Sequence, residues 1–466
     1  MTTDPAVRQQ QQKSEAAAPI TLTAPAARAI GARSTGLRLG ALFGPAVFGV
    51  TAAGVALPKV TAALHTTPAA TAWVLTVHAL ALGIGTALFG RLGDSLGVRT
   101  TLLAGSVVLL LGTGICVSAT NLGALVAGRF VLAAGSGAMT SGALTLAASR
   151  DPASRPKVLA GFGATMAAFS AGATLMGGVI TQWLSWRLTV VLPVLSLLAV
   201  PFCLRLATRP GSRKPVDVAG AALLTLTAAA LLVLIQSPTL SLSTPVVLVT
   251  ALLVVLGAGA LALRVRGLPT GFVPKSLAGD RLFLLSAAVG VGVYGGLFAA
   301  MYAVPQVLVK TYGWSVLTVG FALLPGAVIG AVLSRAAGRI SGSGGSRLLA
   351  GAAAASAALL AVAGVYGGGA ILLVAGASLG FAAFAVTQVV TTGLMSARIP
   401  PAQRGGAMGL LNLTFFVGGA VGSAAAGALS RSMALTGALG LVAVLPLVAA
   451  LVALALDGSA AQPEQA

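Results

Sequence analysis

Two ionisable side chains, His78 and Arg129, lie deep inside long apolar stretches of the sequence. A histidine changes its charge between about pH 5 and 8, so His78 is a candidate proton carrier. The alternative is a neutral histidine that is hydrogen-bonded to a neighbouring helix. Arg129 keeps its charge and is a candidate for coupling or substrate binding. The alternative for Arg129 is a structural brace that donates hydrogen bonds to carbonyl groups.

The eight acidic residues all lie in tails, in loops or at the edges of the apolar stretches: Asp4, Glu15, Asp94, Asp151, Asp217, Asp280, Asp457 and Glu464. A carboxylate in apolar surroundings is the usual group for binding and releasing a proton inside a membrane. Because this sequence places no carboxylate there, His78 is the titratable candidate at depth.

Other polar side chains inside apolar stretches are candidates for lining a substrate cavity: Tyr294, Tyr302, Gln306, Gln388 and Asn412. The alternative is that they join helices through hydrogen bonds, which contribute about 0.6 kcal/mol each in membranes. We expect the neighbouring Phe415 and Phe416 to pack rather than to bind a ligand.

The sequence offers no set of residues for enzyme chemistry or for a cofactor. Cys116 and Cys203 both lie in apolar runs without the spacing of metal ligands. No Ser/His/Asp set and no phosphate-binding loop is found. We therefore expect no enzyme activity, no cofactor and no metal ion.

The amino-acid composition indicates what kind of structural elements must position these side chains. Of 466 residues, 57% are hydrophobic and 8% are charged, whereas about a quarter are charged in a soluble domain. This balance excludes a water-soluble globule and makes the lipid bilayer the main partner. The net charge is +20, but the basic residues form no patch with interleaved aromatics, so we expect no nucleic-acid partner.

A helix needs about 20 apolar residues to cross a bilayer, and the sequence contains fourteen such runs. With the N-terminus in the cytoplasm, 23 of the 28 lysines and arginines fall on the cytoplasmic side, in agreement with the positive-inside rule. The sequence therefore predicts an all-α polytopic membrane protein in the inner (plasma) membrane, with both termini cytoplasmic. The predicted spans are 37–58, 72–92, 100–119, 123–147, 158–181, 187–207, 217–236, 245–263, 282–308, 316–335, 348–366, 370–394, 405–429 and 434–456.

A repeated loop divides the chain into two halves. Residues 90–99 recur as residues 338–347 with Gly, Arg, Ser, Gly and Arg at matching positions. Eight spans separate these loops, which predicts two six-helix halves with an inserted hairpin. The expected parts are a disordered cytoplasmic tail (1–36), an N-terminal six-helix bundle (37–207), a hairpin of spans 7 and 8 with its linkers (208–281), a C-terminal six-helix bundle (282–456) and a cytoplasmic tail (457–466). The hairpin has no ionisable residue between Val218 and Leu263, so we interpret it as lipid-facing or as a docking surface.

The loop at residues 90–99 reads Gly90-Arg91-Leu92-Gly93-Asp94-Ser95-Leu96-Gly97-Val98-Arg99. It resembles the signature between helices 2 and 3 of the major facilitator superfamily, and the chain is most similar to the fourteen-helix drug/proton antiporter branch. The resemblance implies a major facilitator fold and a gating latch made of Gly90, Arg91, Asp94, Gly97 and Arg99. The glycines allow a tight turn, and Asp94 sits near positive helix ends and arginines until the halves rock apart.

One further stretch resembles this family, and two others depart from its pattern. Arg129, which is followed by small residues, matches the helix 4 motif. The acid usual in the first helix aligns with Gly49, so Arg129 loses its expected partner. The helix 5 motif Gly-Pro-x-x-Gly-Gly retains only Gly177 and Gly178.

The resemblance implies an exporter of small hydrophobic organic compounds, such as antibiotics, that works by alternating access in exchange for protons. The alternative is an uncoupled facilitator or importer of a small metabolite, which the missing acid favours. A non-transporting membrane sensor is disfavoured by the gating loop. We expect a monomer whose partners are a small-molecule substrate and protons, with a net positive cavity that favours anionic or neutral substrates.

Overall fold

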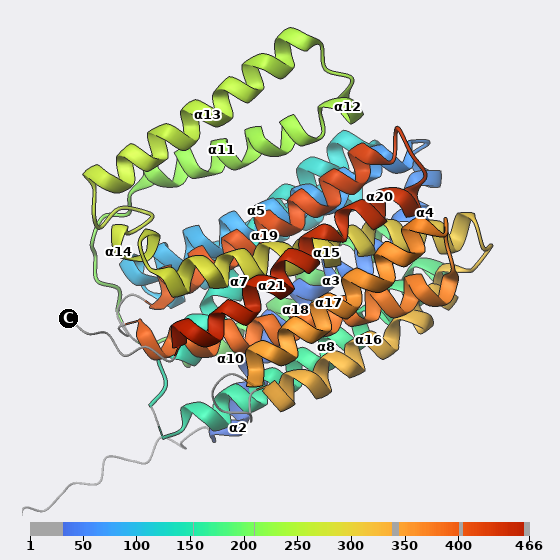
Figure 1. Cartoon of the computed structure of the whole chain (residues 1–466). Coiled ribbons are helices and arrows are strands. Elements are labelled where there is room, and N and C mark those ends of the chain that lie inside the picture. Colours follow the sequence, from blue (N-terminus) through green and yellow to red (C-terminus); the bar gives the residue numbers. More distant parts are fainter. Residues whose placement is uncertain (1–30, 152, 209, 338–343, 400–403, 461–466) are drawn as a thin grey trace, which may run out of the picture. The chain divides into compact units, whose positions relative to one another are not determined.

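The computed structural model describes residues 31–151, 153–208, 210–337, 344–399 and 404–460. Within these ranges, 12 helices are long and apolar enough to cross a membrane (Figure 1). They are the first span, formed by α2 (Ala32–Phe43), α3 (Pro45–Phe48) and α4 (Thr51–Ala63), then α5 (Pro68–Leu96), α6 (Val98–Ser118), α7 (Leu122–Ala148), α11 (Val218–Ile235), α13 (Thr244–Gly267), α15 (Arg281–Lys310), α16 (Val316–Ala337), α17 (Gly344–Val365), α18 (Ala370–Arg398), α19 (Arg404–Leu429), and α20 (Leu435–Val442) with α21 (Val444–Ala460).

The remaining two predicted spans are also helical. The fifth is α8 (Arg155–Trp183), and the sixth is a broken segment made of α9 (Trp186–Val190), the 3-10 helix η1 (Leu192–Leu198) and α10 (Val200–Leu204). The sixth span is interrupted because Pro193 and Pro201 lack the N–H that a continuous helix needs. The prediction of an all-α membrane protein with a major facilitator fold is confirmed, and the described helices are consistent with fourteen spans. The short helix α12 (Ser237–Leu240) lies in the turn of the hairpin between α11 and α13, and α14 (Lys275–Ala278) lies in the linker after it.

The first span is interrupted between Phe48 and Thr51, where α3 ends and α4 begins. The span also begins at Ala32, which is earlier than the predicted start. The second copy of the repeated loop lies largely at residues 338–343, outside the described residues, as do the tails at 1–30 and 461–466. The interruption matters because it places the Gly49 carbonyl outside regular helix.

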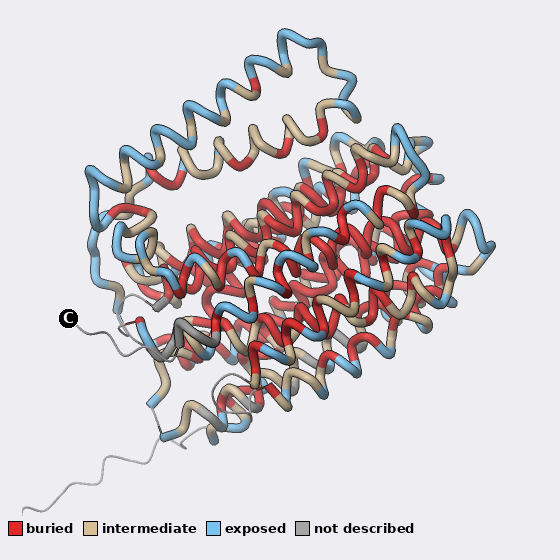
Figure 2. The backbone as a smooth tube through the Cα atoms, in the orientation of Figure 1, coloured by how far each residue is buried: buried red, intermediate tan, exposed pale blue. Residues whose placement is uncertain are grey.

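The two six-helix bundles pack on each other mainly through α5 against α19 and α8 against α16. Figure 2 shows the buried residues concentrated in the helices of the bundles. In the fully described helix α13, by contrast, Thr250 is the one buried residue. The α11–α13 hairpin thus lies at the edge of the bundles, where α11 contacts α5 and α19.

Candidate functional site

The guanidinium of Arg129, on α7, is fully buried and binds three backbone carbonyl groups. Nη1 donates to Val190 O at 2.6 Å and Nε donates to Val74 O at 3.4 Å. Nη2 donates to the carbonyl of Gly49, at the interruption of the first span. A buried charge is tolerated when hydrogen bonds satisfy it. This arrangement agrees with the brace that the sequence left as an alternative, since one guanidinium fastens the first, second and sixth spans to α7.

Gly49 and His78 share one space between the first span and α5. A Cβ atom at position 49 would lie 2.1 Å from Nε2 of His78. The imidazole is fully buried, and neither of its nitrogens has a hydrogen-bond partner among the described residues. The histidine therefore fills the position where the resemblance implies an acidic side chain. His78 and Arg129 thus both contact Gly49: the imidazole of His78 lies where a side chain at position 49 would begin, and Arg129 donates to the Gly49 carbonyl.

Three of the five predicted cavity residues come together in the C-terminal bundle. Gln388 on α18 donates its Nε2 hydrogens to the Tyr294 hydroxyl at 2.6 Å and to Oδ1 of Asn412 at 3.0 Å. Asn412 in turn donates to Met408 O at 3.0 Å. The Tyr294 ring also lies 4.7–6.2 Å, centroid to centroid, from four phenylalanine rings: Phe298, Phe384, Phe415 and Phe416. We call these seven side chains the aromatic cluster.

The sequence reasoning missed Phe298 and Phe384 as members of this cluster. The signal was available for Phe298, because residues four apart share one face of a helix and Tyr294 precedes it by four. Phe415 and Phe416 follow Asn412 at three and four residues, and in the structure both pack against Tyr294. For Phe384 the spacing to Gln388 is again four. Helical spacing thus relates the members on each helix, whereas the meeting of the three helices α15, α18 and α19 is seen only in the structure.

The other two predicted cavity residues lie at one end of the bundle. Tyr302 donates its hydroxyl hydrogen to Pro68 O at 2.9 Å, and the hydroxyl lies 3.3 Å from Ser430 Oγ. Gln306 donates to Tyr302 O at 3.1 Å. Pro68 begins α5 of the N-terminal bundle, so Tyr302 joins the two bundles there. We call this end of the molecule the Pro68 end.

The paired glycines of α8 serve two different contacts. A Cβ on Gly177 would lie 2.7 Å from Ala52 Cα in the first span, within the same bundle. A Cβ on Gly178 would lie 2.9 Å from Val316 O of α16, and one on Gly320 would lie 2.6 Å from Thr174 O. Gly178 and Gly320 therefore allow the two bundles to meet backbone to backbone.

The opposite end, which we call the Asp94 end, holds a second contact between the bundles. Asp94 accepts a hydrogen bond at 3.0 Å from the backbone N–H of Gly406, in the first turn of α19. The positive end of a helix dipole favours a carboxylate at this position. A Cβ on Gly90 would lie 3.0 Å from Gly405 O, so the small residue lets α5 approach α19. The two bundles are thus joined at both ends of the molecule.

The remaining residues of the predicted latch differ in their roles. Gly97 adopts φ +90° between α5 and α6, a conformation that favours glycine. Arg91 donates to Phe272 O at 2.8 Å and to Gly271 O at 3.4 Å. Arg99 is exposed at the start of α6, and no hydrogen bond or ion pair joins it to another residue in the described part of the chain. The structure therefore brings Gly90, Arg91, Asp94 and Gly97 together but leaves Arg99 outside.

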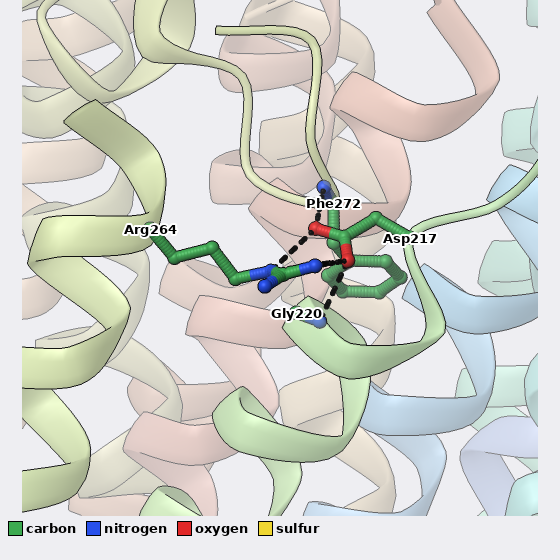
Figure 3. Close-up of polar contacts among 4 residues, drawn as sticks. All are labelled: Asp217, Gly220, Arg264 and Phe272. Carbon is green, nitrogen blue, oxygen red and sulfur yellow. Dashed lines mark hydrogen bonds and ion pairs between the residues drawn. The ribbon is translucent and has the colours of Figure 1, made fainter. Parts of the chain in front are cut away.

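Asp217 fastens the base of the hairpin to the linker at Phe272 (Figure 3). Its carboxylate accepts from Arg264 Nη2 at 2.5 Å and from the N–H groups of Gly220 at 2.9 Å and Phe272 at 3.0 Å. We call these contacts of Asp217 the clasp. Because Phe272 O is also the acceptor for Arg91, the clasp positions the linker that binds the latch residue Arg91. The lipid-facing interpretation fits the middle of the hairpin, and this anchored base is an addition that the sequence did not indicate.

We expect an Asp217→Asn variant to be less stable than the unaltered protein at pH 6. The hydrogen bond from Arg264 lowers the pKa of Asp217 to about 2, against about 3.9 for a free aspartate. The stabilisation is therefore fully present above about pH 4 and is lost as the pH falls toward 2. Solvent screening limits it to about 1 kcal/mol or less. Thermal unfolding in detergent should show a difference at pH 6 that narrows below pH 4.

The exposed Asp151 offers a matched control for this measurement. Asp151→Asn should leave the unfolding temperature at pH 6 unchanged. A difference between Asp217→Asn and the unaltered protein that widens on acidification would contradict the clasp.

Two six-helix bundles that meet at both ends, with a buried polar and aromatic cluster in one of them, define a polytopic helical membrane protein of the two-bundle kind. The family model of the Major Facilitator Superfamily matches residues 46–387. The chain therefore belongs to this superfamily.

Several relatives are known by sequence. A Mycobacterium tuberculosis (strain H37Rv) protein described as the uncharacterized MFS-type transporter EfpA is 28% identical over 280 residues, which is 59% of this chain and 53% of the relative. The methylenomycin A resistance protein of Bacillus subtilis (strain 168) is 27% identical over 60% of this chain and 61% of its own length. The riboflavin transporter RibZ of Clostridioides difficile (strain 630) is 23% identical over 59% and 60%. The matches thus span less than two thirds of each relative.

Solved structures share the fold. The human organic anion transporter MFSD10 (TETRAN) superposes with a TM-score of 0.58 at 18% identity, covering 91% of this chain and 98% of that protein. A POT family transporter gives a TM-score of 0.63 at 15% identity, covering 92% and 97%. At these identities the likeness concerns the fold alone.

Proposed function

We propose that this protein is a secondary exporter that moves small hydrophobic organic compounds across the plasma membrane by alternating access. The observation that carries this function is the aromatic cluster, enclosed between contacts of the two bundles at both ends. The five aromatic rings offer apolar and stacking contacts, while the Tyr294–Gln388–Asn412 chain offers hydrogen bonds. The methylenomycin A resistance protein among the relatives supports this substrate class.

Alternating access requires the contacts at the two ends to open in turn. At the Asp94 end the carboxylate must leave the N-terminus of α19. At the Pro68 end the Tyr302 hydroxyl must leave Pro68 O, and Gly178 must separate from α16. We assign the Asp94 end to the cytoplasm, because basic residues concentrate in the loops of that end and cytoplasmic loops carry this excess.

We propose His78 as the group that exchanges protons during the cycle. It lies at depth on α5, and its two nitrogens have no partner within the described ranges. Access of water from one end at a time lets the imidazole take up a proton on one side and release it on the other. Arg129 then acts as the brace that keeps the first, second and sixth spans around this histidine.

A His78→Gln variant should separate proton exchange from substrate movement. In inverted vesicles with a preformed pH gradient, addition of a transported drug should dissipate the gradient for the unaltered protein. The variant should lose this dissipation at least tenfold and retain exchange of labelled substrate across a membrane without a gradient, because glutamine keeps a polar side chain but cannot take up a proton. Drug susceptibility of a pump-deficient host that expresses the protein identifies the substrate to use.

The second candidate function is an uncoupled facilitator or importer of a small metabolite. Two observations favour it: the described parts of the spans hold no carboxylate between the bundle ends, and all three donor nitrogens of Arg129 are bound to backbone carbonyls. The riboflavin transporter among the relatives is in keeping with such a substrate. Substrate movement through the unaltered protein without any change in the pH gradient would decide for the facilitator and against the exporter.

A further inference from the structure

A pocket of about 510 Å³ lies at the Pro68 end, apart from the aromatic cluster. Both bundles and the hairpin contribute to its wall. Pro68 comes from α5, Thr239 from α12, Gln306 and Lys310 from α15, and Arg431 from the turn after α19. A volume of about 300–1,000 Å³ is typical of sites for small organic molecules. The pocket is therefore large enough for a ligand of drug size.

The charge of this pocket is positive. Its lining contains Lys310 and Arg431 and no aspartate or glutamate. Asp94, Asp217 and Asp280 lie in the loops and helix starts of the opposite, Asp94 end. Arg431 uses Nη1 to hold the Pro238 carbonyl and Ser241 Oγ. Lys310 forms no ion pair within the described ranges, so its ammonium is available to an anion.

Two polar atoms of the lining are unsatisfied. Oε1 of Gln306 and Oγ1 of Thr239 are buried and have no hydrogen-bond partner among the described residues. Gln306 is fully buried, and its Nε2 is already used for Tyr302 O. A buried acceptor without a donor costs about 1–3 kcal/mol. A ligand hydroxyl or amine would remove that cost.

The position of the pocket connects it to the gate at this end. Tyr302, whose hydroxyl joins Pro68 O and lies near Ser430 Oγ, is one helical turn from Gln306 on α15. Pro68 and Ser430 are themselves part of the pocket lining. A ligand in the pocket therefore lies against the contact that must break when the Pro68 end opens.

We propose that this pocket binds a small organic anion that also carries a hydroxyl or amine donor. Lys310 and Arg431 bind the anionic group, Gln306 accepts from the donor, and Val307 and Leu435 contact the apolar part. The role of the bound anion as a substrate that is leaving or entering rests on the proposed function. The binding itself does not, and it is measured without transport.

The test uses fluorescein at pH 5.5, where it is mainly a monoanionic carboxylate that keeps a phenolic hydroxyl, and the full chain in nanodiscs of zwitterionic phosphatidylcholine. Fluorescence anisotropy should show saturable binding that weakens as salt is raised. Lys310→Gln should weaken binding about tenfold, the effect expected for loss of one charge-assisted contact of about 1.4 kcal/mol. Because Lys310 makes no ion pair with any residue that the structure describes, this variant should keep the unfolding temperature of the unaltered protein. Arg431→Gln should weaken binding as well.

Lys59 provides the matched control, because it is an exposed cation at the same end that does not line the pocket. Lys59→Gln should bind fluorescein like the unaltered protein, and the cationic dye rhodamine 6G should not displace fluorescein. Absence of saturable binding to the unaltered protein, or equal binding to the Lys310→Gln and unaltered proteins, would overturn the site. Failure of the exporter function would instead leave fluorescein binding intact and abolish substrate flux.

Discussion

An Arg129→Ala variant is expected to lose transport almost completely and to unfold at a clearly lower temperature than the unaltered protein. The substitution removes the donors from three buried carbonyl groups, those of Gly49, Val74 and Val190. Each carbonyl left without a donor costs about 1–3 kcal/mol. Three spans would lose their common fastening to α7 at once.

An Arg129→Lys variant should have a transport rate and an unfolding temperature between those of Arg129→Ala and of the unaltered protein. A lysine keeps the charge, but its compact ammonium lacks the planar fork that reaches three carbonyls in different directions. We expect partial loss of stability and a larger loss of transport. Scanning fluorimetry in detergent measures the first, and substrate flux in proteoliposomes measures the second.

Arg187 is a suitable control for both variants. It also donates to a backbone carbonyl, that of Ala119 at 2.8 Å, but it is half-buried and stacks on Trp186 at 4.4 Å. Arg187→Ala should change stability by less than about 1 kcal/mol. If Arg129→Ala kept the unfolding temperature and lost only the transport of anions, Arg129 would be a substrate-binding residue and the brace would be wrong.

The second large effect is expected at Gly49. An alanine there places its Cβ 2.1 Å from Nε2 of the fully buried His78, and overpacking of this kind costs about 1–3 kcal/mol. Shortening the histidine should remove that cost. We therefore expect Gly49→Ala to be destabilising alone and nearly neutral in a His78→Ala background.

A double-mutant cycle measures this dependence directly. The coupling between the two substitutions should be about 1–3 kcal/mol. Gly114→Ala is the matched control, since a Cβ at this membrane glycine meets nothing within 4 Å, and its effect should be the same with and without His78. An equal cost of Gly49→Ala in both backgrounds would show that the histidine does not occupy this space.

The spans were predictable from the sequence because about 20 consecutive apolar residues have few alternatives to a membrane helix. The interruption of the sixth span was also legible in Pro193 and Pro201, yet a hydropathy argument alone treats the segment as continuous. The start of the first span at Ala32 was missed because its first residues are not apolar enough to signal a helix.

The site was only partly predictable. Polar residues inside apolar runs identified Tyr294, Gln388 and Asn412, which the structure brings together. Gln306 is 12 residues further along α15 than Tyr294, about 18 Å at the rise of an α-helix. This distance already made it unfavourable to place Gln306 and Tyr294 in one substrate cavity.

The partners of Arg129 carried no signal in the sequence. All three are backbone carbonyls, and every residue has one, so only the folded chain shows which are left free. The clasp of Asp217 depends in the same way on a linker 55 residues away. Contacts of this kind are set by the packing of distant segments rather than by local residue pattern.

The hairpin is fastened at both ends of the bundle, by Arg431 to Pro238 at one end and by Asp217, Phe272 and Arg91 at the other. Its helix α13 has 24 residues, which is about 36 Å of nearly incompressible length. It is therefore a strut in contact with lipid. We expect a bilayer that thins or thickens around it to change its tilt, and this change would act on the contacts that hold the hairpin at both ends.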